Sequence, residues 1–238
     1  MKMESVLLDI VSLGLSPFTK KFFAKINSNS DVNKTLSLYS KDKFTKIRFW
    51  DAPFIEVEKL VTKKGNITDI GCGEGIFTNF LAVSSRDRKV LGVEIDQNRF
   101  EKASKVSKNL DNVTFKKGDA TKVSIPQSDN IILFHLLHHL KSFDDQETTI
   151  KNCLSSLKNG GKLIIVEVDQ KFSWKFFVSW YVDCFLVPWI FEKRFYTPVH
   201  YRSKNSWLKL LTSLGVSCKV SSVEKEKPFT HIILECKK

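Results

Sequence analysis

The feature that most constrains the fold is an alternation of strand-like and helix-like segments between residues 66 and 168. Two of the strand-like runs, Ile131–Phe134 and Leu163–Val166, are continuously apolar, which is typical of parallel strands that are covered on both faces. Strands that alternate with helices over units of roughly 30 residues predict a doubly wound, mostly parallel α/β sheet. This pattern argues against a coiled coil and against a disordered chain.

The pattern predicts a sheet of seven strands in total. We expect strands over residues 66–70, 89–95, 113–116, 130–136, 162–168, 218–223 and 231–236. We expect helices over residues 76–84, 97–109, 143–157 and 206–214, and a turn at residues 159–161.

Residues 1–65 lack this alternation, so we expect a helical N-terminal extension there and the main domain over residues 66–238. Apolar residues recur with helical spacing over residues 6–15, and Pro17 is expected to end that helix. The polar stretch 27–33 is typical of a loop. A further helix is expected to begin at Pro53 and to end before Gly65.

The composition is that of a globular chain, with 42% hydrophobic and 27% charged residues. No apolar run reaches the ~18 residues of a membrane span, and the N-terminal run containing Asp9 is a poor signal peptide. The five cysteines are odd in number, and no two have CxxC spacing. We therefore expect reduced thiols, neither a zinc site nor a disulfide framework, and a cytoplasmic location.

The net charge of +12 is unevenly distributed. Residues 1–65 hold 12 basic and 7 acidic residues, residues 66–168 hold 14 and 13, and residues 169–238 hold 12 and 6. Basic flanks around a nearly neutral centre favour an anionic partner that meets the flanks. A role in solubility alone is equally compatible with these counts.

A glycine-rich turn follows the first expected strand and begins the first expected helix. It reads Gly71-Cys72-Gly73-Glu74-Gly75, and glycines in such a turn allow positive φ angles and a close approach of a ligand to the backbone. The GxGxG spacing differs from the GxGxxG of dinucleotide sites, which disfavours an NAD-dependent dehydrogenase. The chain also lacks a P-loop sequence.

Two carboxylates follow the next two expected strands. Glu94 comes about 20 residues after the glycine loop, where a carboxylate can accept hydrogen bonds from both hydroxyls of a ribose. Asp119 ends the third strand, where it can accept from the exocyclic amine of adenine. Both lie at the carboxyl ends of strands, where open α/β sheets bind ligands, so the combination predicts a nucleoside pocket.

This ordered combination resembles the class I S-adenosylmethionine-dependent methyltransferases over roughly residues 50–170. The segments that carry the resemblance are Asp69–Gly75, Leu91–Asp96, Gly118–Ala120, Asn130–Leu140 and Leu157–Leu163. It implies a Rossmann-like methyltransferase fold, with the last two strands forming an antiparallel hairpin next to the fifth. It also implies S-adenosylmethionine as cofactor. The cofactor-binding residues that it implies are Asp69, Gly71, Cys72, Gly73, Gly75, Glu94, Ile95, Asp119, Ala120 and His135.

The segment after the fourth expected strand reads Phe134-His-Leu-Leu-His-His-Leu140. It lacks the Asn/Asp-Pro-Pro-aromatic sequence of base and glutamine N-methyltransferases and looks more like the small-molecule branch. His135, His138 and His139 are candidate catalytic residues, because a histidine can deprotonate an acceptor hydroxyl near neutral pH. Packing against the adenosyl group or capping a helix is the alternative for each. No nearby carboxylate completes a metal site with them, so no metal is expected.

An aromatic-rich insertion, residues 172–196, precedes the last expected helix, and we assign residues 170–204 to a helical lid or acceptor insertion. Trp174, Phe177, Tyr181 and Phe185 are spaced by three or four residues, so one helical face can be wholly aromatic. Such a face is either buried or meets a lipid or another partner. Flanking lysines suit an interfacial helix on anionic lipid and, less well, stacking on RNA bases.

The sequence therefore favours a methyltransferase that acts on an oxygen or carbon of a hydrophobic or lipid-like small molecule, with peripheral membrane contact through residues 172–196. An RNA or protein methyltransferase that uses the basic flanks is an alternative. A non-catalytic binding protein on the same fold is another. The identity of the acceptor is left open.

Overall fold

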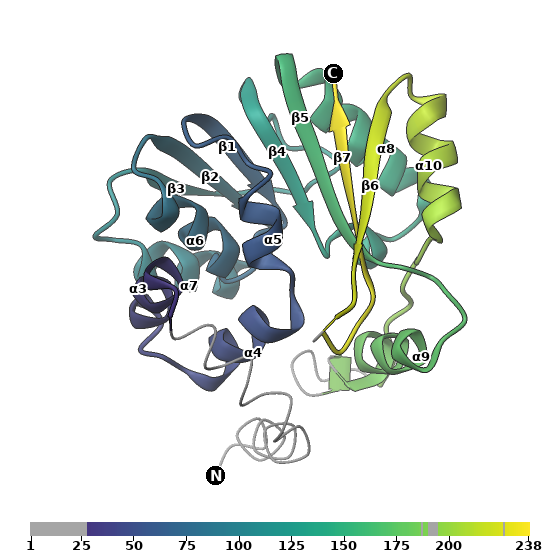
Figure 1. The fold of residues 1–238 in the computed structure, drawn as a ribbon, viewed down its shortest axis with the longest axis horizontal. Coiled ribbons are helices and arrows are strands. Elements are labelled where there is room, and N and C mark those ends of the chain that lie inside the picture. The colour runs from purple at the N-terminus through teal and green to yellow at the C-terminus, as the bar shows by residue number, and fades with distance from the viewer. Residues whose placement is uncertain (1–27, 187, 190–194, 226) are drawn as a thin grey trace.

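The computed structural model describes residues 28–186, 188–189, 195–225 and 227–238. These residues fold around a seven-stranded sheet with the strand order β3-β2-β1-β4-β5-β7-β6 (Figure 1). The strands are β1 (Gly65–Ile70), β2 (Arg88–Glu94), β3 (Val113–Lys117), β4 (Ser128–Phe134), β5 (Leu157–Val168), β6 (Ser217–Val223) and β7 (His231–Lys237). Strands β1 to β5 pair in parallel, and β7 runs antiparallel between β5 and β6. The predicted sheet and its closing hairpin are confirmed.

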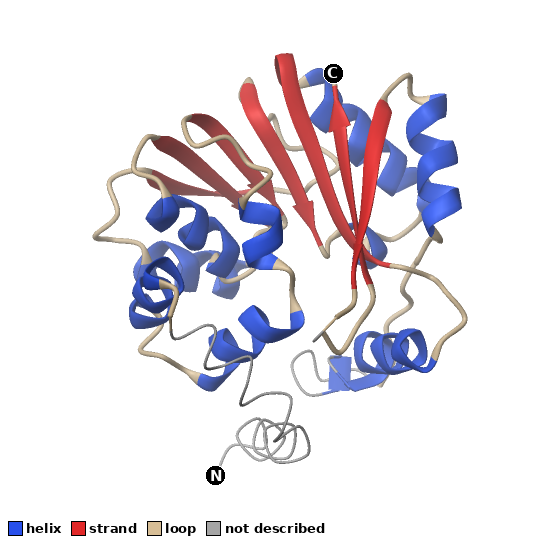
Figure 2. Ribbon diagram, in the orientation of Figure 1, coloured by secondary structure: helices blue, strands red, loops and turns tan. Residues whose placement is uncertain are grey.

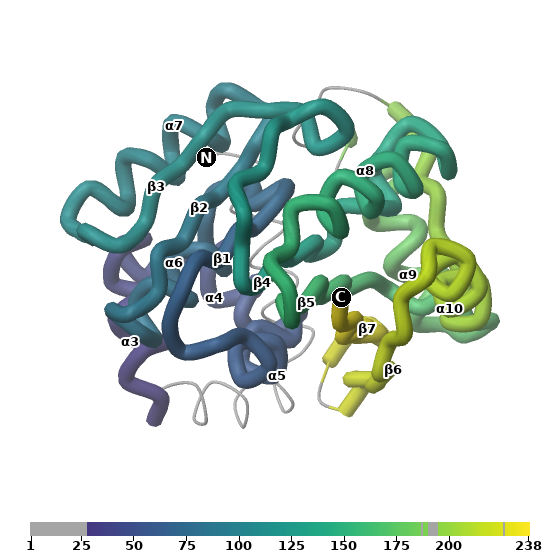
Figure 3. Tube along the Cα trace, turned by 90° about the horizontal axis from the view of Figure 1, so that it is seen from above, coloured from purple at the N-terminus to yellow at the C-terminus, as the bar shows by residue number. Residues whose placement is uncertain are grey.

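Helices cover both faces of the sheet, as Figures 2 and 3 show for α5 and α6 on one side and α8 and α10 on the other. The helices are α3 (Ser30–Leu38), α4 (Lys43–Asp51), α5 (Phe54–Glu58), α6 (Ile76–Ser84), α7 (Gln97–Val106), α8 (Phe143–Ser155), α9 (Trp174–Tyr181) and α10 (Lys204–Ser213). Neighbouring residues of β4 serve both sides: Ile132 packs in one hydrophobic cluster and Ile131 in the other. This double coverage explains why the central strands are continuously apolar.

The N-terminal helices share the core of the sheet. Val32 of α3, Phe49 of α4 and Phe54 of α5 pack in the same cluster as Ile67 of β1. The Tyr39 hydroxyl, just after α3, donates to the Glu74 carbonyl at 2.7 Å, so this segment also braces the glycine loop. The helix expected within residues 6–15 lies outside the described residues.

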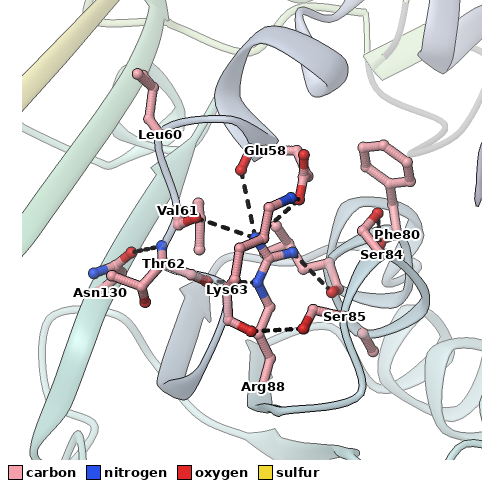
Figure 4. Close-up of polar contacts among 12 residues, drawn as sticks. Glu58, Leu60, Val61, Thr62, Lys63, Phe80, Ser84, Ser85, Arg88 and Asn130 are labelled. Carbon is pink, nitrogen blue, oxygen red and sulfur yellow. Dashed lines mark hydrogen bonds and ion pairs between the residues drawn. The ribbon is translucent and has the colours of Figure 1, made fainter.

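A buried arginine joins the N-terminal segment to the sheet (Figure 4). The Arg88 guanidinium is fully buried and donates to the carbonyls of Thr62 at 2.7 Å, Leu81 at 3.0 Å and Val61 at 3.1 Å. It also bonds the Glu58 carboxylate at 2.9 Å. Arg88 thereby supplies a donor to three backbone carbonyls and fixes the connection that leads from α5 into β1.

The structure corrects two local predictions. Residues 27–33 are not all loop: α3 begins at Ser30, because the Asn29 side chain accepts from the backbone N–H groups of Asp31 and Val32 and caps the helix. The turn expected at residues 159–161 lies inside β5, where the pairing with β4 shifts register between Ser128 and Asn130. Helix α4 was not predicted.

The expectation of five reduced thiols is wrong for two of them. Cys218 of β6 and Cys236 of β7 form a disulfide, with their Cα atoms 4.1 Å apart. The two residues stand directly opposite each other in the antiparallel register. The two cysteines are 18 residues apart in the sequence. Only the pairing of β6 with β7 brings them together, so no disulfide could be inferred from their spacing in the sequence.

Two helices lie beyond the carboxyl ends of the parallel strands, α4 and α9 (Figure 1). Lys227, in the turn between β6 and β7, donates its Nζ to the carbonyls of Phe49 at 3.2 Å and Ala52 at 2.7 Å. Lys175 of α9 donates to the carbonyl of the same Lys227 at 3.0 Å. The hairpin turn therefore links α4 to α9 at this end of the sheet. Within the described ranges, no helix has both the length and the apolar character that crossing a bilayer requires.

Candidate functional site

A cavity of about 420 Å³ lies at the carboxyl ends of the parallel strands. Its walls come from α4, the glycine loop, the segment after β4, and the inner side of α9 with the π-helical segment Val182–Leu186 that follows it. Open α/β sheets bind ligands at this edge. The cavity is therefore the candidate functional site.

The glycine loop forms one wall of the cavity. Gly71 has a φ of 73°, and a Cβ there would stand 2.6 Å from the Leu136 side chain, so only glycine fits. Gly73 also has a positive φ, but a Cβ there would meet open space. The loop therefore leaves room beside Gly73 in which a ligand can approach the backbone.

Asp69, at the end of β1, lies at the base of this wall and lines the cavity. Its Oδ2 accepts from the Thr78 hydroxyl at 2.6 Å, whereas its Oδ1 is buried and has no partner. Burial raises the pKa of the Asp69 carboxyl to about 7, and the negative charge of Glu94 adds to this shift. A buried acceptor without a donor is suited to a cationic or hydrogen-bonding ligand group.

Glu94 ties the second strand tip to the glycine loop. Its Oε2 accepts from the Gly73 N–H at 2.7 Å, and its Oε1 accepts from the N–H groups of Ile95 and Asp96, both at 2.9 Å. The Gly118 N–H in turn donates to the Glu94 carbonyl at 3.0 Å, which holds the third strand tip beside the second. The three predicted nucleoside-binding segments are thus adjacent in space.

The predicted cofactor-binding residues divide into two groups. Asp69, Gly71, Cys72, Gly73 and His135 line the cavity. Gly75, Glu94, Ile95, Asp119 and Ala120 lie outside its lining; Ile95 is largely exposed, and Asp119 accepts from the Thr121 N–H and hydroxyl. The second group extends from the glycine loop to the tips of β2 and β3.

His138 is held by a buried carboxylate. Its Nδ1 contacts Glu167 Oε2, and Glu167 Oε1 accepts from the Leu137 N–H at 2.8 Å. Glu167 lies in β5 and is 1% exposed. Burial by itself would lower the pKa of His138, but the charge and hydrogen bond of Glu167 raise the pKa above its usual value. The pairing fixes the imidazole with Nδ1 toward Glu167 and leaves Nε2 on the opposite side.

The other side of His138 faces two residues of the lid or acceptor insertion, residues 170–204. Its Nε2 lies 3.7 Å from Asp183 Oδ2, and that oxygen accepts from the Tyr201 hydroxyl. The Tyr201 ring stacks on the imidazole, with centroids 4.8 Å apart and planes 12° apart. Burial, together with the charge of Asp183, raises the pKa of Tyr201, so its hydroxyl remains a donor. The stack and the two carboxylates set the orientation of the His138 ring.

The other two candidate histidines line the same cavity in different settings. His135 has a φ of 49°, stacks on His231 at 4.9 Å, and has its Nδ1 3.5 Å from Arg48 Nη2. Burial, with the nearby His231 and Arg48, lowers the pKa of His135 well below its usual value, so its ring is neutral. His139 is exposed, with its ring centroid 4.1 Å from that of His138.

His138, His139 and Asp183 also place one ligand atom each within 4.8 Å of one another. The Asp183 carboxylate comes from the insertion and is distant from the two histidines in the sequence, so the sequence did not predict this group. The same Nε2 of His138 cannot both hold a metal ion and accept a proton. The roles of metal ligand and general base are therefore alternatives for His138, and an experiment can distinguish them.

Three residues of the site were missed in the sequence: Arg48, Glu167 and Asp183. Glu167 carried a signal, because it is a lone charged residue in the otherwise apolar run of β5. Arg48 lies in a helix that was not predicted. Asp183 and Tyr201 reach His138 only through tertiary packing of the insertion, which no sequence spacing reports.

Residues 67–161 match the family described as "Methyltransferase domain". An (S)-coclaurine N-methyltransferase of Thalictrum flavum subsp. glaucum is 27% identical over 155 residues, which are 63% of this chain and 42% of that protein. A ubiquinone biosynthesis O-methyltransferase of Coxiella burnetii is 28% identical over 120 residues, which are 49% of each chain. The chain thus spans about half the length of the curated relatives it matches.

Solved structures share the fold over more of the chain. The magnesium protoporphyrin IX methyltransferase of Synechocystis PCC 6803, solved with bound SAH, superposes with a TM-score of 0.61 at 17% sequence identity. The match covers 97% of this chain and 99% of that one. At this identity the likeness concerns the fold, and it includes the seven-stranded sheet with its flanking helices.

Proposed function

We propose that the chain is a class I S-adenosylmethionine-dependent methyltransferase, which the match of residues 67–161 to a methyltransferase domain supports, and that it methylates a hydroxyl oxygen of a hydrophobic small molecule. The observation that carries the proposal is the buried Glu167–His138 pair, which lies on the wall of a largely apolar cavity beside the glycine loop. His138 is the general base, and Glu167 is the residue that positions it.

The residues at the cavity fit the methyl donor. The orphaned Oδ1 of Asp69 is a partner for the donor's ammonium group, and the open space beside Gly73 accommodates an approach to the backbone. Glu94 and Asp119 stand where a ribose and an adenine are expected at the tips of β2 and β3. When bound, S-adenosylmethionine supplies an electrophilic methyl carbon, so that a C–O bond forms as the C–S bond breaks.

His138 supplies what a hydroxyl acceptor needs. Its neutral Nε2 accepts the acceptor's proton while Glu167 keeps Nδ1 on the opposite side. The imidazolium that results lies between the carboxylates of Glu167 and Asp183, which favours the charged form. His135 stays neutral and is engaged by Arg48, so it contributes to the wall rather than to proton transfer.

The remaining walls are suited to an apolar acceptor. Phe44 and Ile47 of α4, Phe134 of β4, Val182 and Leu186 all line the cavity. Ligand pockets of this kind bury an apolar body and orient it with a few polar groups. Exclusion of water also protects the reactive donor from hydrolysis.

Methyl transfer from labelled S-adenosylmethionine to a hydrophobic extract tests the proposal. We expect a labelled product in the organic phase whose new methyl signal is that of an ether. His138→Ala should reduce kcat by roughly 10²- to 10⁴-fold, the contribution of a positioned general base, without weakening S-adenosylhomocysteine binding. Activity should persist in EDTA. Loss of activity on chelation would reassign His138 to a metal site, and binding without any transfer would favour a non-catalytic protein.

A further inference from the structure

Helix α9 directs its apolar face toward solvent, the reverse of the usual arrangement of a surface helix. Trp174, Phe177, Val178 and Tyr181 occupy one helical face, and all four are exposed, with Trp174 at 69% and Tyr181 at 56%. Ser179 lies on the opposite face and is 2% exposed. A surface helix of a soluble domain normally directs its apolar face inward, so the outward face of α9 lacks a partner within the described chain.

The exposed aromatic face is part of a continuous patch. Of the eleven large hydrophobic side chains that are exposed in the described part of the chain, nine lie between Phe172 and Tyr196. Phe172 packs on Phe177 with ring centroids 5.4 Å apart, and Phe185 contacts Tyr181 at 5.7 Å and Tyr196 at 5.3 Å. We call this surface the α9 patch; its exposed members are Phe172, Trp174, Phe177, Val178, Trp180, Tyr181, Trp189, Phe195 and Tyr196. A contiguous apolar surface of this kind marks an interaction site.

Helix α9 lies at the same end of the molecule as α4 (Figure 1). Exposed lysines lie near α9: Lys171 precedes the helix in the chain, and Lys225 is in the β6–β7 turn that Lys175 of α9 contacts. Lys43, at the start of α4, is exposed at the same end of the sheet. Trp and Tyr side chains beside lysines are the residue types that favour the interface of a membrane.

We propose that the α9 patch docks on the surface of an anionic lipid bilayer. The aromatic face enters the boundary between headgroups and acyl chains, and the lysines remain among the anionic headgroups. The net charge of +12 favours this occupant over a second copy of the chain, because two such copies repel each other whereas anionic lipid attracts them.

The docked orientation places the candidate site next to the membrane. Ser179, Val182 and Asp183 belong to α9 and the segment that follows it, and all three line the cavity on its inner side. The same element therefore offers its outer face to lipid and its inner face to the acceptor. Where the proposed function holds, a membrane-dissolved acceptor reaches His138 past this element.

Vesicle binding tests the inference without donor or acceptor, so its result is independent of methyl transfer. The full chain is sedimented with large vesicles of phosphatidylcholine and phosphatidylglycerol in equal parts, and with vesicles of phosphatidylcholine alone. We expect binding to the mixed vesicles that weakens as salt is added. Three of the five tryptophans, Trp174, Trp180 and Trp189, lie in the patch, and Trp50 and Trp207 are buried. Binding should therefore shift the tryptophan emission to shorter wavelength.

Variants assign the binding to the patch. The double variant Trp174→Ser/Phe177→Ser should bind mixed vesicles at least tenfold more weakly, with an unchanged circular dichroism spectrum and melting temperature. Phe143→Ser removes an exposed aromatic residue that is not a member of the patch and should bind as the wild type does. Lys171→Glu should weaken binding to the mixed vesicles only.

Three results would overturn the inference. The first is the absence of sedimentation with the mixed vesicles. The second is equal vesicle binding by the double variant and the wild type. The third is a wild-type dimer that the double variant converts to a monomer, or an RNA affinity that it abolishes, in the absence of vesicle binding; either would assign the patch to a different partner.

Discussion

The Glu167 carboxylate and the His138 imidazole form a buried pair that joins the end of β5 to the segment after β4. Glu167 also accepts from the backbone N–H of Leu137, the residue before His138. One carboxylate thus fixes both the backbone and the ring of the histidine. An arrangement of this kind sets the tautomer of a catalytic imidazole and stabilises its protonated form.

The pH dependence of methyl transfer follows from this pair. His138 acts as a base only when it is neutral, and Glu167 raises its pKa, so kcat should rise with pH through a midpoint above 6.5. Glu167→Gln removes the negative charge that raises the pKa and should move that midpoint to lower pH while lowering the plateau. A pH–rate profile of both proteins measures the shift. An unchanged midpoint in the variant would show that protonation of another group causes the loss of activity at low pH.

A second pH effect is expected in donor binding. The pKa of Asp69 is about 7 in the free protein, and a cationic ligand group favours the ionised carboxylate. Binding of S-adenosylhomocysteine should therefore release a proton from Asp69 below pH 7, and affinity should fall as the pH decreases below that value. Calorimetry in two buffers of different ionisation enthalpy measures the released proton. Asp69→Asn should bind more weakly, with an affinity that is independent of pH between 6 and 8.

Thr78→Val provides the matched control for Asp69. The Thr78 hydroxyl donates to Asp69 at 2.6 Å and lowers the pKa of that carboxyl. Its removal should raise the pKa further and move the loss of affinity to higher pH. A shift in the opposite direction would contradict the assignment of Asp69 as the titrating group.

The elements that the sequence predicted well are those with strong local signals. Helix α6 follows a glycine turn and begins and ends where it was expected, at Ile76 and Ser84. The apolar runs of β4 and β5 are buried on both faces. Short, continuously apolar runs of this kind are readily assigned as central strands. Helix α4 had no such signal, because the positions that it buries depend on packing with Phe54 and Phe80. Its side chain Arg48 was missed for the same reason.

The candidate site was predictable where it follows from strand ends. The glycine loop, Glu94 and Asp119 were placed by their positions after β1, β2 and β3, and the structure brings these segments together. The partners of His138 come from a strand and an insertion that lie 29 and more residues away in the chain. Their convergence depends on tertiary packing, so the sequence identified the histidines but could not rank them.

The contacts of Arg88 predict that the two salt-bridge partners of Glu58 contribute very differently to the free energy of unfolding. Arg88 is fully buried, whereas the Lys63 side chain is 66% exposed. Arg88→Leu leaves several carbonyls without their donor and leaves the largely buried Glu58 carboxylate with Lys63 alone, and should lower the free energy of unfolding by about 3–5 kcal/mol. Lys63→Ala should cost at most ~1 kcal/mol, since exposed ion pairs contribute little. Urea unfolding compares the two, and equal losses would argue against a structural role for Arg88.

The last prediction concerns Glu94, which the structure joins to the glycine loop through the Gly73 N–H. Glu94→Ala removes the acceptor for three backbone N–H groups and the expected partner of the ribose hydroxyls. Affinity for S-adenosylhomocysteine should fall by roughly 1–3 kcal/mol, the range for hydrogen bonds to a charged group, as measured by calorimetry. Glu94→Gln retains one acceptor oxygen and should lose less. If Glu94→Ala binds the ligand as the wild type does and only melts earlier, the carboxylate holds the loop and the ribose contact is misassigned.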